Sequence, residues 1–251
     1  MQTNYFFDCN CSVGKRSRPA PGTFSHPQDL KNRMQRYGIE KALVYHSMAR
    51  EYDPETGNRM ILAEIRDDPT LLPVWVTMHH HTGECLVPGT LVDRLVQHKI
   101  RAVRMFPAQA DQNFSIAEWN CGELLGALAD AGVVLLIGMN QLTWDELNQL
   151  CGNHPKLKVI FTDLNYRIDR NIYALLDRHP ALHLESGGYK VHNGIEEICG
   201  RFGAQRLVFG SGMPMYSGAS AVSMIRYARI SEREKSLIAF GNLSALLART
   251  P

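Results

Sequence analysis

The stretch VVLLIGMNQLTWDELNQL, residues 133–150, contains the unit that decides the fold. Its first part, Val133–Ile137, is an apolar run of strand length, as expected for a strand buried on both faces of a sheet. Its second part begins with TWDE, residues 143–146, which has the form of a capping box and predicts the start of a helix. A buried strand that leads into a helix is half of a parallel β–α–β unit.

The same unit recurs along the whole chain. Each apolar run is followed by a segment with helical spacing, such as Pro27–Tyr37, which opens at a proline, and Ser115–Ala131, which ends at Gly132. Eight such units in 251 residues predict an α/β protein, a (β/α)8 TIM barrel. The eight predicted strands are Tyr5–Cys9, Lys41–Tyr45, Leu72–Met78, Ile100–Met105, Val133–Ile137, Leu157–Thr162, Leu182–Ser186 and Arg206–Phe209.

We expect a single domain over residues 1–251, because no internal repeat, low-complexity tract or Pro/Gly-rich linker divides the chain. A doubly wound open sheet is the competing architecture. Its first turn is usually rich in glycine, whereas the turn from Asp8 to Gly14 here lacks the pattern GxGxxG. Lys15–Ser25 is expected to be a long loop after the first strand, on the face where barrel active sites lie.

Composition excludes several partners and compartments. Lysine and arginine number 27 against 25 acidic residues, so the net charge of +2 offers no basic field for nucleic acid. No apolar run approaches the roughly 20 residues that span a bilayer, and the N-terminal Met1–Asn4 lacks the basic residues of a secretory leader. The six cysteines contain no CxxC pair, which is typical of reduced thiols. We expect a cytoplasmic protein.

Polar residues stand at the carboxyl end of nearly every predicted strand, where a barrel holds its reaction space. Asp163 and Glu185 follow neighbouring strands and are candidates for an acid/base pair, although carboxylates that only bridge strands would have the same pattern. Arg104 is suited to clamp a carboxylate or phosphate of a substrate, or to pair with one of these two acids. The other candidate substrate-binding residues are Asn10, Ser12, Asn140, Ser211 and Gly212. Glycine-rich turns after the last two strands also favour an anionic ligand.

The histidines allow two interpretations. His79 and His81 are two residues apart at a strand end, so both rings face one side and could ligate a metal or act as bases. The alternative is a polar strand end whose rings meet water or backbone carbonyls. His46, after the second predicted strand, is either a further candidate base or a hydrogen-bonded interior histidine.

Six segments resemble one family over nearly the whole chain. They are FDCNCSVG (7–14), GIEKALV (38–44), IRAVRMFP (100–107), HPKLKVI (154–160), RLVFGSGMP (206–214) and GNLSALL (241–247). The sequence resembles the amidohydrolase-related TIM-barrel family of the amidohydrolase 2 type, which contains metal-dependent hydrolases and decarboxylases. The resemblance implies a metal-dependent-hydrolase-like barrel, with a homodimer as the expected assembly.

The resemblance also implies a metal, usually zinc, held by four histidines and an aspartate. The family's ligand positions fall on Asn10, Ser12, Gly138, Asp163 and Gly212 in this sequence. None is the expected ligand, and only Asp163 has a charged oxygen. The sequence is therefore interpreted as a divergent member that lacks the family's metal ligands, and we expect no cofactor.

Three functions follow from this pattern. The first is a hydrolase or a decarboxylase-type lyase that acts on a small polar or anionic substrate without the family's metal centre. The second is a catalytically inactive barrel that binds a small anionic ligand or a protein partner. The third is a hydrolase with a relocated metal site built on His79 and His81 with Asp163 or Glu185.

Overall fold

The computed structural model describes residues 5–248. Residues 1–4 and 249–251, which the predicted single domain includes, lie outside the described residues. Met1–Asn4, on which the expected localisation partly rests, is among them. Within residues 5–248, no helix is long and apolar enough to cross a membrane.

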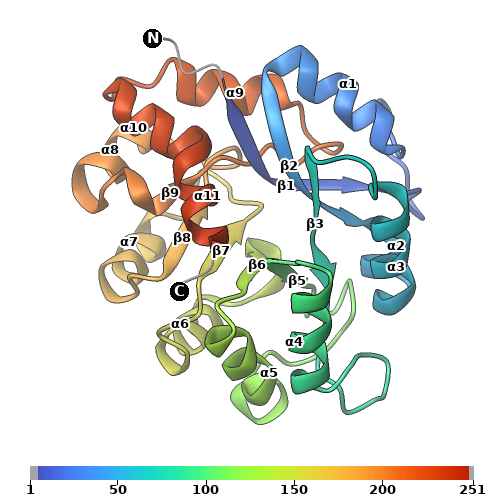
Figure 1. The fold of residues 1–251 in the computed structure, drawn as a ribbon. Helices are drawn as coiled ribbons and strands as arrows, with labels where there is room; N and C mark the ends of the chain where they lie inside the picture. The colour runs from blue at the N-terminus through green and yellow to red at the C-terminus, as the bar shows by residue number, and fades with distance from the viewer. Residues whose placement is uncertain (1–4, 249–251) are drawn as a thin grey trace.

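The structure is an α/β barrel of parallel strands surrounded by helices (Figure 1). Within residues 5–248, nine strands form two sheets, one in the order β1-β2-β3 and one running from β4 to β9, and every neighbouring pair is parallel. The strands are β1 (Phe6–Val13), β2 (Ile39–His46), β3 (Leu71–Pro73), β4 (Trp75–Val76), β5 (Ala102–Met105), β6 (Val134–Gly138), β7 (Val159–Thr162), β8 (Leu182–Glu185) and β9 (Leu207–Val208).

The two sheets meet at the third predicted strand, Leu72–Met78, which is divided into β3 and β4. Pro73 has no N–H group to donate to the ladder, and the next N–H, of Val74, bonds the carbonyl of Val44 at 2.8 Å. From Trp75 onward the chain pairs with β5 instead. The second junction joins β1 to the segment after β9, because Cys9 N–H donates to Phe209 O and Ser12 N–H to Met213 O, each at 2.9 Å. The predicted barrel is confirmed.

Helices follow most strands and cover the outside of the barrel (Figure 1). The predicted helix over Pro27–Tyr37 is confirmed, whereas the one predicted from Ser115 begins at Glu118. The helices are α1 (Pro27–Tyr37), α2 (Ser47–Glu51), α3 (Pro54–Glu64), α4 (Pro88–Gln97), α5 (Glu118–Asp130), α6 (Trp144–Asn153), α7 (Asp169–Arg178), α8 (Gly194–Phe202), α9 (Gly218–Arg226), α10 (Glu232–Ser236) and α11 (Asn242–Leu247), with the short 3-10 helices η1 (Met139–Gln141) and η2 (Ala204–Arg206) and the short π-helix η3 (Leu237–Gly241).

The core has two parts because alternate strand residues face opposite sides. The larger part lies between the strands and the surrounding helices. The smaller part includes Phe7, Ala102, Leu136 and Ile160 from different strands, with Leu243 of α11 among them. On β5 and β7, the next side chains on the same face as Ala102 and Ile160 are the polar Arg104 and Thr162.

Candidate active site at the carboxyl ends of the strands

A bulge in β1 places an amide at the centre of the barrel mouth. The register between β1 and β2 shifts between Asp8 and Cys11, which adds one residue to β1, and the Asn10 side chain reaches the polar residues of the barrel mouth. The buried Asp8 carboxylate supports this shape, because its Oδ1 accepts hydrogen bonds from the N–H groups of Asn10 and Ser211, each at 2.9 Å. Burial raises the pKa of Asp8.

Arg104 of β5 lies beside this amide and is 2% exposed. One guanidinium nitrogen donates to Asn10 Oδ1, and the other donates to Thr162 Oγ1 at 3.1 Å and Asp163 Oδ2 at 2.6 Å. The rings of Tyr45 and Phe106 each lie with their centroid 5.1 Å from the guanidinium carbon. Of the two roles predicted for Arg104, the structure shows the ion pair with Asp163.

Asp163 and Glu185 are brought together, as predicted for strands that are neighbours in the barrel. The amide nitrogen of Asn10 donates to Asp163 Oδ1 and to Glu185 Oε2, both at 3.1 Å, and the backbone N–H of Asp163 donates to Glu185 Oε2 at 2.8 Å. Asp163 has φ 56°, in the left-handed region that few non-glycine residues adopt. This conformation turns its N–H toward Glu185 while its side chain reaches Arg104.

The environment of Glu185 favours the protonated carboxyl. The side chain is 2% exposed, and burial, followed by the nearby charge of Asp163, raises its pKa from 4.5 to about 8. Burial and the neighbouring charge therefore both favour a proton on this carboxyl group in the barrel mouth. Such a group can act as a general acid.

Both acids open onto a small cavity of about 200 Å³. Asp163 and Glu185 line it together with residues from the turns after β7, β8 and β9. The glycine-rich turns that predicted an anionic ligand contribute directly to this lining, and Lys190 adds a cation. We call this space the active-site cavity; it is lined by Asp163, Leu164, Asn165, Tyr166, Glu185, Gly187, Gly188, Lys190, Ser211 and Tyr216.

The side chains of Asn140 and Asp163 both lie close to Gly138. A Cβ added to Gly138 would be 2.8 Å from Asp163 Oδ2 and 2.9 Å from Asn140 Oδ1. The amide of Gln141 donates to Asn140 Oδ1 at 3.3 Å and to Asp111 Oδ2 at 2.7 Å. Glycine at 138 therefore makes room for the carboxylate of Asp163.

Ser12, Ser211 and Gly212 belong to the junction between the first and last strands. Ser211 Oγ accepts from the N–H of Met213 at 3.1 Å and lies 3.8 Å from Cys11 Sγ. The N–H of Gly212 donates to Asn10 O at 2.9 Å, and its φ of 71° is one that glycine adopts without strain. Of these three residues, only Ser211 lines the active-site cavity.

His46 is placed differently from the acid pair. Its Nδ1 accepts from the N–H of Met48 at 3.1 Å, which caps the short helix α2, and its Nε2 lies 3.4 Å from Glu64 Oε1. Burial lowers its pKa. These contacts match the interior, hydrogen-bonded histidine that the sequence offered as the alternative to a base.

His79 and His81 pack against each other rather than against the acids. Their ring centroids are 5.5 Å apart in a stacked arrangement, and His79 also meets the ring of Phe114 edge-on. Burial lowers the pKa of His79. Across residues 5–248, no group of three or more His, Cys, Asp or Glu side chains is arranged to hold a metal ion.

Several residues of the site were not identified from the sequence. Thr162, Lys190, Tyr166 and Tyr216 contact the cluster or line the cavity, but each stands in a loop or strand end without a motif. Only the position of these residues, close after the ends of predicted strands, could have indicated them from the sequence. Lys190 lies two residues beyond Gly188 and Tyr216 two residues beyond Pro214, in the loops that follow the last two strands.

Comparison with known proteins gave matches among solved structures only. No protein-family model matches the chain, and no curated protein does. A 2,6-dihydroxybenzoate decarboxylase from Rhizobium is 15% identical, with a TM-score of 0.73 over 98% of this chain and 99% of that one. A 5-carboxyvanillate decarboxylase from Novosphingobium aromaticivorans is 11% identical, with a TM-score of 0.76 over 98% of each chain. A dihydroxybenzoic acid decarboxylase from Polaromonas is 13% identical, with a TM-score of 0.71 over 97% of each.

The expectation that no cofactor is involved is corrected by these structures. The Novosphingobium and Polaromonas proteins are described with bound manganese. The expectation relied on the absence of four histidines and one aspartate that would hold zinc, whereas manganese prefers carboxylate, carbonyl and water oxygens. Missing histidines are therefore no argument for a lost metal. In the arrangement described here, however, Arg104 and Asn10 engage the carboxylates of Asp163 and Glu185, and these side chains do not fit a metal ion.

The resemblance found in the sequence is thus confirmed at the level of the fold. The similar structures cover nearly all of this chain, and their own chains are covered just as fully. The acid pair, its arginine and its cavity lie at the end of the barrel where active sites of this architecture are built. The chain has the TIM-barrel fold of these decarboxylases.

Proposed function

We propose that this protein is a decarboxylase-type lyase that acts on a small aromatic carboxylate bound in the active-site cavity. The observation that carries the proposal is the buried Glu185 carboxyl, held beside Asp163 by one shared amide and open to the cavity. The fold supports it, because the similar structures include decarboxylases of aromatic acids.

The cavity suits one aromatic ring with an acid group. Its volume of about 200 Å³ is below the 300–1,000 Å³ typical of sites for larger ligands. Tyr166 and Tyr216 offer aromatic surface on its wall, and Lys190 lies with its ammonium 5.9 Å from the centroid of the Tyr216 ring. We assign the anchoring of the substrate carboxylate to Lys190 rather than Arg104, because Arg104 is paired with Asp163 and does not line the cavity.

The proposed chemistry uses the proton of Glu185. Loss of carbon dioxide breaks a carbon–carbon bond and leaves the electron pair on the ring carbon, which must then take a proton. Glu185 lines the cavity and its surroundings favour the protonated carboxyl, so it donates to that carbon. Its carboxylate then regains a proton from water. The strained Asp163 positions Glu185 through its N–H.

The test is turnover of a panel of hydroxybenzoates labelled with ¹³C in the carboxyl group, with labelled carbon dioxide and bicarbonate as the readout. The panel includes 2,6-dihydroxybenzoate and 5-carboxyvanillate, and each reaction is run with and without added Mn²⁺. The variants are Glu185→Gln, which keeps the shape of the carboxyl, and Lys190→Met. The matched control is Lys156→Met, because Lys156 is exposed and lies outside the cavity.

The proposal expects label release by the wild type and the control. Glu185→Gln should lower kcat by about 10² to 10⁴-fold, the usual contribution of a general acid. Lys190→Met should mainly raise KM, since Lys190 binds the substrate without entering the chemistry. Saturable binding with no product, from every substrate and with or without Mn²⁺, would refute the lyase and support the inactive, ligand-binding barrel.

A further inference from the structure

A second, larger concavity lies on the rim of the barrel, between the loop after β1 and helix α1. Its volume is about 780 Å³, within the range of sites for small molecules. None of its lining residues lines the active-site cavity. We call it the rim groove; it is lined by Gly14, Lys15, Arg16, Pro19, Gly22, Thr23, Phe24, Ser25, Asp29, Asn32, Arg33 and Arg36.

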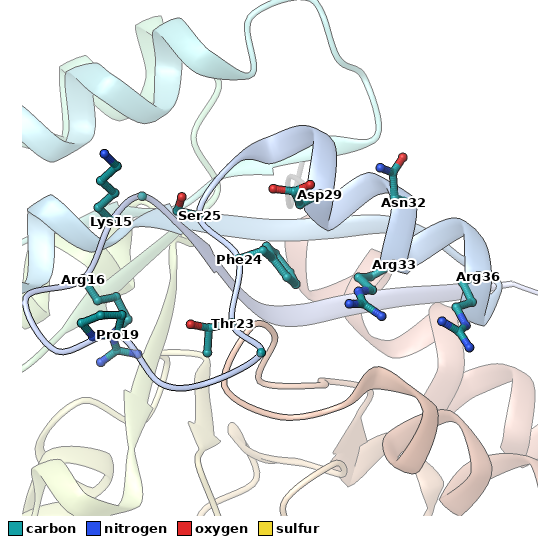
Figure 2. A pocket seen from close by; sticks show the side chains of 12 residues that line it. Lys15, Arg16, Pro19, Thr23, Phe24, Ser25, Asp29, Asn32, Arg33 and Arg36 are labelled. Carbon is teal, nitrogen blue, oxygen red and sulfur yellow. The ribbon is translucent and has the colours of Figure 1, made fainter.

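One wall of the rim groove is a single face of α1. Asp29, Asn32, Arg33 and Arg36 follow the spacing that places helix residues above one another. Leu30 and Met34 of the same helix are buried against the core, so they hold α1 in place while this polar face stays exposed. In Figure 2, Arg33 and Arg36 lie along the helix on one side of the groove.

The opposite wall is the loop of residues 14–25. Figure 2 shows Arg16 and Pro19 at one end and Phe24 between Arg16 and Arg33. Phe24 is half-buried and packs against the core, which fixes the middle of the loop. Arg16 is fixed as well, because its Nε donates to Glu51 Oε1 at 3.2 Å while the N–H of Ser17 donates to Glu51 Oε2 at 2.7 Å.

The charge of the rim groove is one-sided. Four cationic side chains line it, against the single carboxylate of Asp29. Among residues 5–248, Glu51 pairs with Arg16, but no carboxylate lies within salt-bridge distance of Lys15, Arg33 or Arg36. Arg33 and Arg36 on the helix wall, with Lys15 on the loop wall, are suited to anionic oxygens, which the guanidinium fork binds two at a time.

We propose that the rim groove is a binding site for a small polyanion, a phosphorylated or polycarboxylated molecule whose anionic oxygens contact Arg33 and Arg36. Phe24 and Pro19 provide apolar surface for the uncharged part of the ligand. Asp29 opposes binding, because its carboxylate lies on the same helix face as the two arginines. This site is separate from the one assigned to the lyase and does not depend on that function.

The experiment is isothermal titration calorimetry of the full chain in metal-free buffer with two probes, pyrophosphate and citrate. They distinguish a preference for phosphate from a preference for carboxylate. The loss variant is Arg33→Ala with Arg36→Ala. Its matched control is Arg66→Ala with Arg170→Ala, which removes the same charge from two exposed positions outside the groove. The gain variant is Asp29→Asn. Thermal melts of all variants check that each is folded.

At least one probe should bind the wild type, more weakly as salt rises from about 20 to about 200 mM. The loss variant should bind about tenfold or more weakly, the gain variant about threefold more tightly, and the control like the wild type. If the loss variant is poorly folded, the affinity of Asp29→Asn still tests the proposal. No binding of either probe at about 5 mM, or equal weakening in the control, would overturn the proposal.

Discussion

Glu185 makes the fold itself sensitive to pH, and the variant Glu185→Gln tests this without any substrate. The pKa of Glu185 is about 8 in the folded chain, against 4.5 for an ordinary glutamate. Below pH 4.5 both the folded and the unfolded chain hold the proton, so Glu185 does not lower the free energy of unfolding. Between pH 4.5 and about 8 the unfolded chain releases the proton while the folded chain keeps it, and stability falls. Above about pH 8 the loss is complete.

The size of the effect follows from the two pKa values. Each pH unit of difference between the two pKa values corresponds to about 1.36 kcal/mol, so the full loss is on the order of 5 kcal/mol. Glutamine cannot ionise, so the variant lacks this loss. Its free energy of unfolding relative to that of the wild type should therefore rise by that amount over the same pH range.

The assay is urea unfolding followed by circular dichroism at pH 5, 6, 7 and 8, roughly the interval over which the difference develops. Other titrating groups, such as His183 with its pKa lowered by burial to about 4, are present in both proteins and cancel in the comparison. The glutamine amide makes different hydrogen bonds, which shift the variant's free energy of unfolding by a constant. This constant does not affect how the difference between the two proteins changes with pH. Parallel stability curves for the two proteins would refute the assignment of a proton to Glu185.

Three further predictions concern the active site. If Glu185 is the proton donor, the kcat of the lyase reaction should fall about tenfold per pH unit above about pH 8, and a flat profile to pH 9 would exclude this role. Gly138→Ala should lower activity about tenfold or more, because its Cβ would stand 2.8 Å from Asp163 Oδ2, whereas Gly126→Ala has open space and should leave activity unchanged. Arg104→Met removes the cation from Asp163 and Asn10, so calorimetry should detect Mn²⁺ binding by the variant and not by the wild type; the same result for both proteins would contradict this account.

The sequence was sufficient for the architecture because each strand–helix unit carries its own local signal. The capping box at Thr143 and the helix opening at Pro27 both stand where they were predicted. The strand pattern predicted an end at Cys9, whereas β1 continues to Val13. The polar residues Asn10 and Ser12 resemble a strand end, although both are buried within the strand.

The site was predictable only in part, because its residues come from distant strands. The meeting of Asp163 and Glu185 followed from strand order in a closed barrel, and so did a partner for Arg104. The amide bridge of Asn10 did not, because it depends on a bulge that no motif marks. The inference about the cofactor was wrong because the five positions were compared with the ligands of zinc, whereas two of the similar structures hold manganese.

The amide of Asn10 has a direction, and that direction is set by three other strands. Its oxygen faces the cation of Arg104, and its nitrogen faces the two acids. An aspartate has the same outline but accepts at both ends, and a leucine of similar volume neither accepts nor donates. A substitution of Asn10 therefore keeps this hydrogen-bonded cluster intact only when residue 104, 163 or 185 changes in a compensating way. Substitutions at these four positions should therefore be correlated in evolution, although the first and last are 175 residues apart in the chain.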